Sequence, residues 1–395
     1  MRRSREVGPP SQAAVSSLPS PRPWRRIASI MLLSIAALTC NGSTEPGQGG
    51  RVIWQVAGSG WSITPSHDSS RVFFGTMDHR LIALDRETGE QVWEASTGVG
   101  PGGTTAGTNT LVVGDVVVVG DVDIYAFDRT TGERRWVFQP NDLDETGRDR
   151  LSADHETIYA SSLYGRVYAI DAKSGAQRWV TQIPGGADRT STFDPTISAG
   201  VVYVGTWHET HPLTGGLAAL DATTGQILWI HDFTPRSPEL DSYCRSHPVV
   251  TGSLVIASAA DGRIYGLDRE TGDTRWVAPA IEGYIYNDWR WLERAGSTVI
   301  STSMSGTVTG IDAATGAVEW STFISKASLL GDIATDGDIV VISLGEVVTL
   351  DAKSGSILWR TGEGKQGGGY WSQPAIDGPR VYASRKDGFV ALRAR

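Results

Sequence analysis

Hydrophobic residues in this chain gather in short runs that alternate with polar turns. Between residues 62 and 95 the runs are SITPS, RVFFGT, LIALD and EQVWEA, and the segments between them are HDSS, MDHR and RETG. Runs of this length, bounded by polar turn residues and rich in valine, isoleucine and aromatic residues, are typical of β-strands. The pattern predicts four short strands joined by tight turns, which together make one antiparallel sheet.

The same pattern recurs along the chain. The string LIALDRETGEQVW at residues 81–93 returns six more times, always with a glycine four residues after an aspartate and a tryptophan eight residues after it. The repeated aspartates are Asp85, Asp128, Asp171, Asp221, Asp268, Asp312 and Asp351. Their spacing of 39 to 50 residues, filled with short strands, is the period of propeller blades of four strands each.

Each fixed position of the repeat has a structural explanation. The aspartate ends the third strand and can accept hydrogen bonds from the amides of the next turn. The glycine supplies the positive φ that a tight turn requires. The tryptophan offers a large apolar surface with a single N–H, which suits it to packing between neighbouring sheets. We therefore expect these residues to build the blades and not to carry chemistry.

Both ends of the repeat region are incomplete, and together they make one more blade. Residues 380–395 supply a second and a third strand, with Arg393 where the aspartate is expected, and residues 51–58 supply Trp54. We expect this N-terminal strand to complete the last blade, because the pairing removes two exposed sheet edges. The predicted fold class is all-β, an eight-bladed β-propeller of four-stranded antiparallel blades. Its positional tryptophans are Trp54, Trp93, Trp136, Trp179, Trp229, Trp276, Trp320 and Trp359.

Charge and cysteine content narrow the functional classes. The 395 residues carry a formal net charge of −9, but the first 39 hold six arginines and one glutamate, so the remainder is more acidic than the whole. Such a body lacks the basic footprint needed to bind nucleic acid independently of sequence. The chain has only two cysteines, so we expect a fold that does not rely on disulfide bonds.

The N-terminus predicts an export signal. Arginines precede an apolar run at residues 27–38, which has the length of a signal-peptide core and is short for a membrane-spanning helix. Cys40 ends this run, and the polar linker after it resembles that of a bacterial lipoprotein, in which the cysteine is lipidated. Lipidation of Cys40, plain secretion and an uncleaved anchor are the alternatives. The expected domains are an export signal at 1–39, a flexible linker at 40–50 and the propeller at 51–395.

The repeated string A-x-D-x-x-[TS]-G-x-x-x-W resembles the pyrroloquinoline-quinone (PQQ) repeat, and the resemblance covers residues 51–395. Propellers with this repeat are of two functional kinds. Quinoprotein dehydrogenases hold PQQ and a calcium ion, whereas BamB-like lipoproteins of outer-membrane assembly are non-enzymatic scaffolds. The larger quinoprotein alcohol dehydrogenases carry an adjacent cysteine pair and often a haem-attachment string, and this sequence has neither. The repeat itself encodes blades and does not distinguish the two kinds.

The longer loops fall on one face of the predicted propeller. In an up-and-down blade, the inter-blade connections and the second hairpin turn emerge together, and the long segments at 138–150, 232–245, 362–371 and 207–216 all belong to that face. Loops on a rigid scaffold commonly hold binding residues. The candidate partner- or ligand-binding residues at the loop ends are Trp61, Arg150, Arg189, Arg245, Asp288, Trp289 and Trp371.

Three arginines from adjacent blades favour a pocket for carboxylates or for an acidic peptide. The alternative is that each arginine pairs with an acid nearby in sequence, such as Asp149, Asp188 or Asp241.

Two other motifs carry weaker signals. The string HETH at residues 208–211 lacks a third ligand at metal-site spacing, so we expect a solvated hairpin tip and no metal there. Cys244 and His247 bring a thiol near an imidazole, but no third group that would orient them is apparent, so we expect no catalytic pair.

The sequence favours a monomeric, non-enzymatic, exported scaffold that docks proteins of envelope assembly through its loop face, with no cofactor and no contact with nucleic acid. Its expected location is the periplasmic face of an outer membrane, or the periplasm or exterior. One alternative is a PQQ- and calcium-dependent oxidoreductase, in which Trp61, Trp289 or Trp371 stacks on the quinone and Asp288 acts as a base. Another is a secreted propeller that binds carbohydrate or peptide on its tryptophans.

Overall fold

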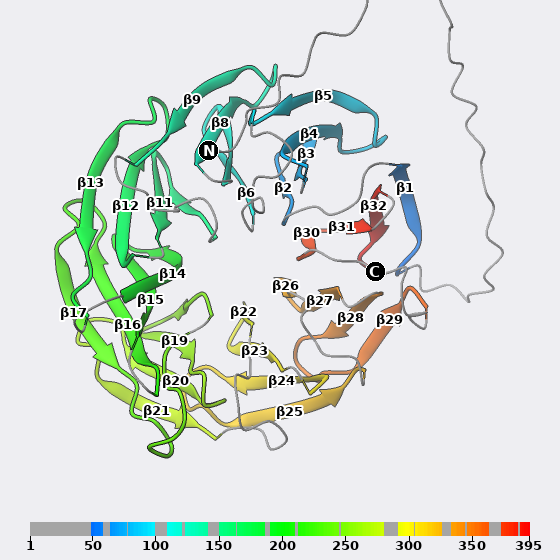
Figure 1. The fold of residues 1–395 in the computed structure, drawn as a ribbon. Coiled ribbons are helices and arrows are strands. Elements are labelled where there is room, and N and C mark those ends of the chain that lie inside the picture. Colours follow the sequence, from blue (N-terminus) through cyan, green and yellow to red (C-terminus); the bar gives the residue numbers. More distant parts are fainter. Residues whose placement is uncertain are drawn as a thin grey trace, which may run out of the picture. The chain divides into compact units, whose positions relative to one another are not determined.

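The fold consists of four-stranded antiparallel sheets arranged in a ring. The computed structural model describes residues 49–57, 64–76, 78–98, 109–120, 123–140, 150–162, 164–185, 190–209, 212–244, 246–279, 291–303, 305–325, 333–343, 346–362, 373–385 and 388–395. These residues form eight sheets and no α-helix, and none of their elements is a helix long and apolar enough to cross a membrane. The sheets follow one another in sequence order around the ring (Figure 1). The predicted eight-bladed propeller is confirmed.

The first four blades each use four consecutive strands. Blade one contains β2 (Ser66–His67), β3 (Arg71–Gly75), β4 (Arg80–Asp85) and β5 (Gln91–Ser96). Blade two contains β6 (Thr110–Val113), β7 (Val116–Gly120), β8 (Ile124–Asp128) and β9 (Arg134–Phe138). Blade three contains β10 (Ser152–Asp154), β11 (Thr157–Ser161), β12 (Arg166–Asp171) and β13 (Gln177–Gln182). Blade four contains β14 (Thr190–Ser198), β15 (Val201–His208), β16 (Thr214–Asp221) and β17 (Ile227–Asp232).

The next three blades repeat this order, and the last one joins the two ends of the propeller. Blade five contains β18 (Val249–Thr251), β19 (Leu254–Ser258), β20 (Ile264–Asp268) and β21 (Thr274–Ala278). Blade six contains β22 (Leu292–Ala295), β23 (Thr298–Thr302), β24 (Thr307–Asp312) and β25 (Val318–Phe323). Blade seven contains β26 (Ile333–Asp336), β27 (Ile339–Ser343), β28 (Val347–Asp351) and β29 (Ile357–Arg360). Blade eight contains β30 (Ala375–Asp377), β31 (Arg380–Arg385), β32 (Gly388–Arg393) and β1 (Val52–Ala57).

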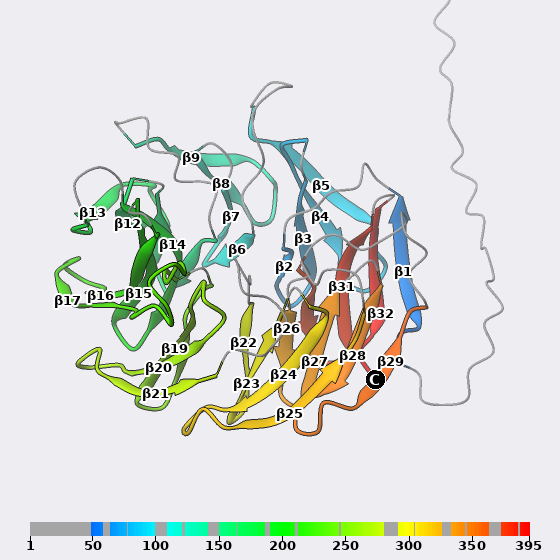
Figure 2. The same cartoon turned by 60° about the horizontal axis from the view of Figure 1, so that its bottom comes forward.

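Burial follows the position of a strand within its blade. The outer strands β5 and β13 are mostly exposed, and the repeat tryptophan is their buried residue. The second strands β7 and β11 are buried at every position, because neighbouring blades cover both of their faces. The buried hydrophobic residues accordingly form eight clusters, one at each boundary between adjacent blades. Figure 2 shows the blades side by side around the axis.

Each repeat tryptophan joins its blade to the next one. Its indole N–H donates to the carbonyl of the residue that follows the repeat aspartate of the neighbouring blade, or follows Arg393 in blade eight, as Trp136 does to Ala172 at 2.9 Å. The eight bonds run from Trp54 to Arg86, Trp93 to Arg129, Trp136 to Ala172, Trp179 to Ala222, Trp229 to Arg269, Trp276 to Ala313, Trp320 to Ala352 and Trp359 to Ala394. The tryptophan ring also packs on the turn glycine of that blade, so the inter-blade role predicted for it is confirmed.

The N-terminal strand closes the ring. β1 pairs antiparallel with β32, from Val52 opposite Leu392 to Ala57 opposite Gly388. The closure predicted from the two incomplete repeats is confirmed, and β1 occupies the outer position that the fourth strand holds in the other blades.

The repeat aspartates hold the turns between third and outer strands. The carboxylate of Asp171 accepts the N–H of Ser174 at 2.8 Å and its hydroxyl at 2.7 Å, and it accepts Arg178 at 2.7 Å. The bond from Arg178, followed by those from Ser174, lowers the pKa of Asp171 below its usual range. Hydrogen bonds likewise lower the pKa of the other six repeat aspartates. The leading bond comes from an arginine of the outer strand at Asp128 and Asp268 and from a turn residue at the other four.

Candidate ligand-binding site on the propeller axis

A pocket of about 620 Å³ lies where the first strands of the blades converge. Its lining includes Thr64, Asn109, Arg150, Pro195, His247 and Glu293, which come from six different blades. The pocket falls within the size range of small-molecule sites. Because the first strand of each blade faces the axis, the fold brings these distant parts of the chain to one place.

Arg150, His247 and Glu293 form a polar cluster in this pocket. Arg150 Nη1 lies 3.3 Å from His247 Nδ1, Arg150 Nη2 lies 3.7 Å from Glu293 Oε1, and His247 Nε2 lies 3.3 Å from the same carboxylate oxygen. Burial opposes ionisation of Glu293, but the contact with His247 and the charge of Arg150 outweigh it, and the pKa of Glu293 lies below its usual range. The cluster therefore holds a carboxylate between a guanidinium and an imidazole.

Side-chain amides fix the beginnings of the inner strands. Asn109 donates to the carbonyl of Leu151 at 2.9 Å and accepts the N–H of the same residue at 2.8 Å. Gln373 donates to the carbonyl of Ile333 at 2.8 Å and accepts the hydroxyl of Thr64 at 2.9 Å. Each amide thus joins neighbouring blades near the axis, which makes the wall of the pocket rigid.

The backbone N–H of Arg150 is also held by another blade. It donates to Asp194 Oδ1 at 2.9 Å, and Asp194 has a φ of 38° in a stretch where the pairing of β14 with β15 shifts register. A positive φ in a residue other than glycine costs free energy and is maintained by the surrounding structure. Here the irregular backbone of β14 presents the Asp194 carboxylate to blade three.

Of the residues predicted for the binding face, the structure describes only Arg150, and it places Arg150 in the axial pocket. Trp61, Arg189, Arg245, Asp288, Trp289 and Trp371 lie outside the described residues, as does the predicted lipidation site Cys40. Two of the acids suggested as partners, Asp149 and Asp188, also lie outside the described residues. Among the described residues, the side chain of Arg150 contacts Glu293 of blade six and His247 of blade five.

The sequence reasoning missed most of this cluster. Glu293 lies a few residues after the predicted candidates Asp288 and Trp289, and His247 was considered only as a partner of Cys244. The position of each residue relative to its inner strand was a usable signal: Arg150 lies just before β10, and Glu293 lies near the start of β22. Aligning every blade on its first strand would have placed these residues around the axis.

Two expectations about individual histidines and cysteines are refined by the structure. His208 does not lie at a solvated tip: the strands β15 and β16 extend the hairpin, and His208 is buried with its Nε2 3.5 Å from Asp232 Oδ1. Cys244 is fully buried, and burial raises the pKa of its thiol to about 12. A thiol that stays protonated is not a nucleophile at neutral pH.

The described axial residues do not fit the calcium ion that accompanies PQQ in quinoproteins. Calcium takes six to eight oxygen ligands. Of the oxygen-bearing side chains at the axis, Asn109, Asp194 and Thr64 are engaged by other blades. Glu293 faces His247 and Arg150, and the positive charge of Arg150 repels a cation. Within the described ranges no group of three or more His, Cys, Asp or Glu side chains could hold a metal ion.

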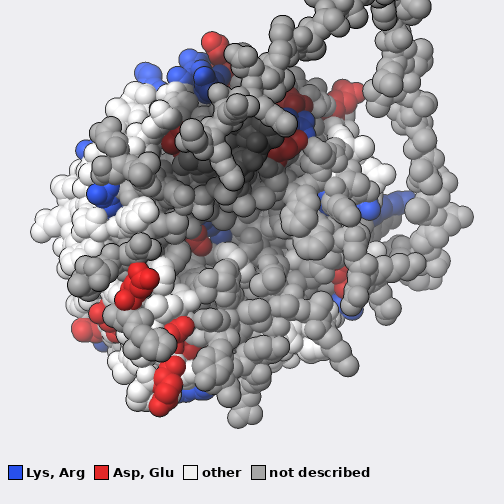
Figure 3. All heavy atoms as spheres, viewed as in Figure 1, with Lys and Arg blue, Asp and Glu red and all other residues white. Residues whose placement is uncertain are grey.

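Charged side chains are scattered over the face drawn in Figure 3. Among the described residues, acidic side chains gather toward the lower left and also appear at the upper right, and basic side chains are spread along the upper edge and the sides.

Comparison with known proteins gives one family and two functional types. The family model described as outer membrane protein assembly factor BamB matches residues 45–191, 120–301 and 292–395. The dehydrogenase subunit of a quinone-dependent alcohol dehydrogenase from Acetobacter aceti is 25% identical over 61% of this chain and 37% of its own length. The outer membrane protein assembly factor BamB of Yersinia pestis is 28% identical over 47% of this chain and 47% of its own length. The chain thus matches less than half the length of either curated relative.

The crystal structure of BamB from Moraxella catarrhalis is similar in fold. It superposes with a TM-score of 0.62, at 18% identity over 86% of this chain and 97% of that one. At that identity the likeness establishes the fold alone.

Proposed function

Since this chain belongs to the family of the outer membrane protein assembly factor BamB, we propose that it is a non-enzymatic, exported scaffold that docks partner proteins of the cell envelope. The docking surface is the face that carries the inter-blade connections and the second hairpin turns. We further propose that the protein reaches the outer membrane as a lipoprotein anchored through Cys40.

The contact of Arg150 with His247 and Glu293 across the axis carries the proposal. In this arrangement Arg150, His247 and Glu293 contact one another, and the amides of Asn109 and Gln373 lock the ends of neighbouring strands. Such a centre is a rigid support. Arg150 retains 23% exposure of its side chain, so a carboxylate from a partner can approach its guanidinium without displacing the cluster.

A site-specific photocrosslinker in cells tests which face docks a partner. Tyr164 is 48% exposed in the turn between β11 and β12, on the proposed face, and Glu156 is 84% exposed in the turn between β10 and β11, on the opposite face. The two positions lie in one blade and differ mainly in the side they occupy. We expect protein adducts from the crosslinker at position 164 and none from position 156. Adducts from 156 alone, or the same adducts from both, would contradict the proposed face.

The alternative is a PQQ- and calcium-dependent oxidoreductase, favoured by the similarity to quinone-dependent alcohol dehydrogenases. Purified residues 41–395 would be titrated with PQQ and calcium while tryptophan fluorescence and thermal stability are followed. The scaffold proposal predicts flat responses in both. Saturable binding with a gain in Tm would overturn it and restore the oxidoreductase.

A further inference from the structure

Blade eight reverses the charge at one position of the repeat. In the other seven blades the third strand ends in the repeat aspartate, which lies directly opposite the first residue of the second strand. In blade one, for example, Asp85 faces Arg71. In blade eight the corresponding residues of β31 and β32 are Arg380 and Arg393, so two arginines face each other.

This arrangement is unfavourable without a counter-ion. Side chains directly opposite each other in an antiparallel pair lie on the same face, and like charges there destabilise the sheet. Arg380 forms an ion pair with Glu87, whose side chain is 66% exposed, and the Nε of Arg380 is buried without a hydrogen-bond partner. No ion pair of Arg393 is found among the described residues. The pair therefore carries positive charge that its surroundings do not fully neutralise.

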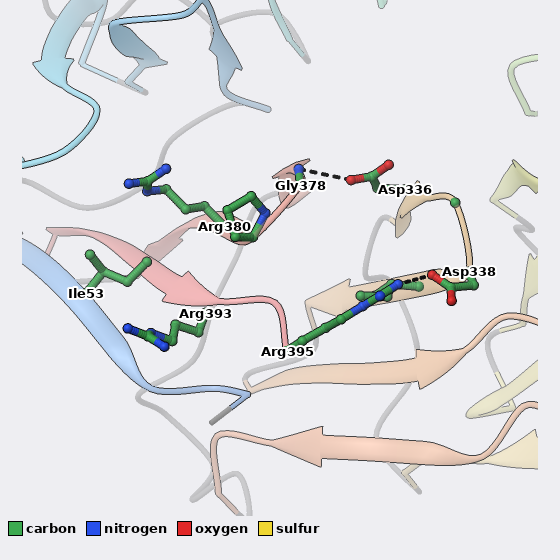
Figure 4. A pocket seen from close by; sticks show the side chains of 10 residues that line it. Ile53, Asp336, Asp338, Gly378, Arg380, Arg393 and Arg395 are labelled. Carbon is green, nitrogen blue, oxygen red and sulfur yellow. Dashed lines mark hydrogen bonds and ion pairs between the residues drawn. The ribbon is translucent and has the colours of Figure 1, made fainter. Parts of the chain in front are cut away.

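The two arginines line a pocket of about 720 Å³ between blades seven and eight. Figure 4 shows both guanidinium groups extending in the same direction with Ile53 between them, while Arg395 extends the other way to its ion pair with Asp338. The second acid of the pocket, Asp336, accepts the N–H of Gly378 at 2.9 Å. Both acids are thus engaged by other groups, and Ile53 and Pro379 add apolar surface.

We propose that this pocket binds the phosphate group of an organic phosphate. Arg380 and Arg393 lie directly opposite each other and their guanidinium groups extend to the same side. Together they match a dianion with three oxygens better than they match a single carboxylate, because each presents paired N–H donors. The pocket is larger than inorganic phosphate needs, and Ile53 and Pro379 provide contacts for an organic part. The turns that line it, β26 to β27 and β30 to β31, lie on the face opposite the proposed docking loops, so the site is independent of the proposed function.

The test measures phosphate binding by calorimetry and by the rise in Tm, using inorganic phosphate and glycerol 3-phosphate. Arg393→Asp restores the arrangement of the other blades and places an acid opposite Arg380. We expect this variant to lose at least about tenfold in affinity, because it removes the donors of one guanidinium and puts a negative charge beside the phosphate. Arg71→Gln is the matched control, because Arg71 holds in blade one the position that Arg380 holds in blade eight, and it faces Asp85. We expect this variant to bind phosphate as the unchanged protein does.

Stability separates loss of the site from loss of the fold. Without phosphate, Arg393→Asp is expected to melt at the same temperature as the unchanged protein or above it, because the like-charge pair becomes an ion pair. The proposal would be overturned if the unchanged protein bound neither the soluble phosphates nor the phospholipid vesicles described below. Equal binding by Arg393→Asp and the unchanged protein would also overturn it.

The source of the phosphate is distinguished by a vesicle arm. Sedimentation with phosphatidylglycerol vesicles, but not with phosphatidylcholine vesicles, together with loss of sedimentation in Arg393→Asp, identifies a lipid headgroup. Saturable binding of glycerol 3-phosphate without vesicle binding identifies a soluble phosphate ester.

Discussion

At the scale of single residues, tryptophan and glycine act as a pair across each blade boundary. The ring of Trp136 lies over Gly175 of the next blade, and its N–H reaches the carbonyl of Ala172. Gly175 has a φ of 73°, so it serves the turn and also leaves room for the ring. Two requirements meet in this residue, one from local backbone geometry and one from packing between sheets.

Substitution of this glycine separates the two requirements. A Cβ on Gly175 would lie 2.7 Å from Trp136, whereas a Cβ on Gly114, whose φ is 57°, would meet nothing within 4 Å. We expect Gly114→Ala to lower the free energy of unfolding by about 1 kcal/mol through its backbone alone. Gly175→Ala should lower it by roughly 2–4 kcal/mol, because overpacking adds to the backbone strain. Urea unfolding of the two variants provides the comparison, and equal losses would contradict the packing role.

The repeat aspartates make stability depend on acid pH. Bonds from Arg275, followed by those from the turn amides, lower the pKa of Asp268 to about 2. A carboxyl with a depressed folded-state pKa contributes stability that is complete above its unfolded value near 4 and is lost as pH falls toward 2. We therefore expect Asp268→Asn to lower Tm at pH 6 and to have little effect at pH 2. Melting curves across this range provide the measurement, and a difference that grew toward low pH would refute the assignment.

At the scale of elements, the outer strand is the part of each blade that depends on its neighbours. Only β1 reaches its blade from the other end of the described propeller, and it supplies Trp54 to the boundary with blade one. Its hydrogen bonds cover the edge of β32, which would otherwise be open to pairing with another chain.

Removal of Arg51–Ala57 is expected to open the last blade. The loss of the β1 ladder and of Trp54 should lower Tm by roughly 10 °C or more and promote self-association through the exposed β32 edge. Calorimetry and size-exclusion chromatography measure the two effects. A monomeric deletion variant with an unchanged Tm would show that the ring does not depend on this strand.

At the scale of the whole molecule, the fold places two sites on different faces. The axial pocket is shared by many blades, since its lining comes from the first strands, and the residues before them, of every blade except blade seven. The arginine pocket belongs to the boundary of blades seven and eight. A scaffold with this layout can engage a partner on one face without blocking a ligand on the other.

Membrane attachment is a separate property of the whole chain. If Cys40 is lipidated, as proposed, Cys40→Ser should move the protein from the membrane fraction to the soluble fraction of cells. Fractionation and immunoblotting measure this change, with the melting temperature of the purified variant as a control for folding. A variant that stays in the membrane fraction would refute lipid anchoring.

The architecture of the propeller was accessible from sequence because the repeat is local. Asp171 and its turn lie within eight residues of Trp179, so one short string encodes a strand end, a turn and an outer strand. The closure of the ring was also accessible, because Trp54 and Arg393 show which strands each end lacks. The candidate site was less accessible from sequence. Arg150 is the one residue proposed from the loop ends that the structure describes at the axis, and its contacts with His247 and Glu293 were not predicted.

The amino-acid sequence by itself determined the number of blades, their order and the closing strand, because strand and turn preferences act over a few residues and repeat regularly. Only the tertiary structure decided which side chains meet. Arg150 and His247 are 97 residues apart, and Arg380 faces Arg393 only through the register of β31 and β32. Such contacts depend on how blades pack and pair, and no local pattern encodes that geometry.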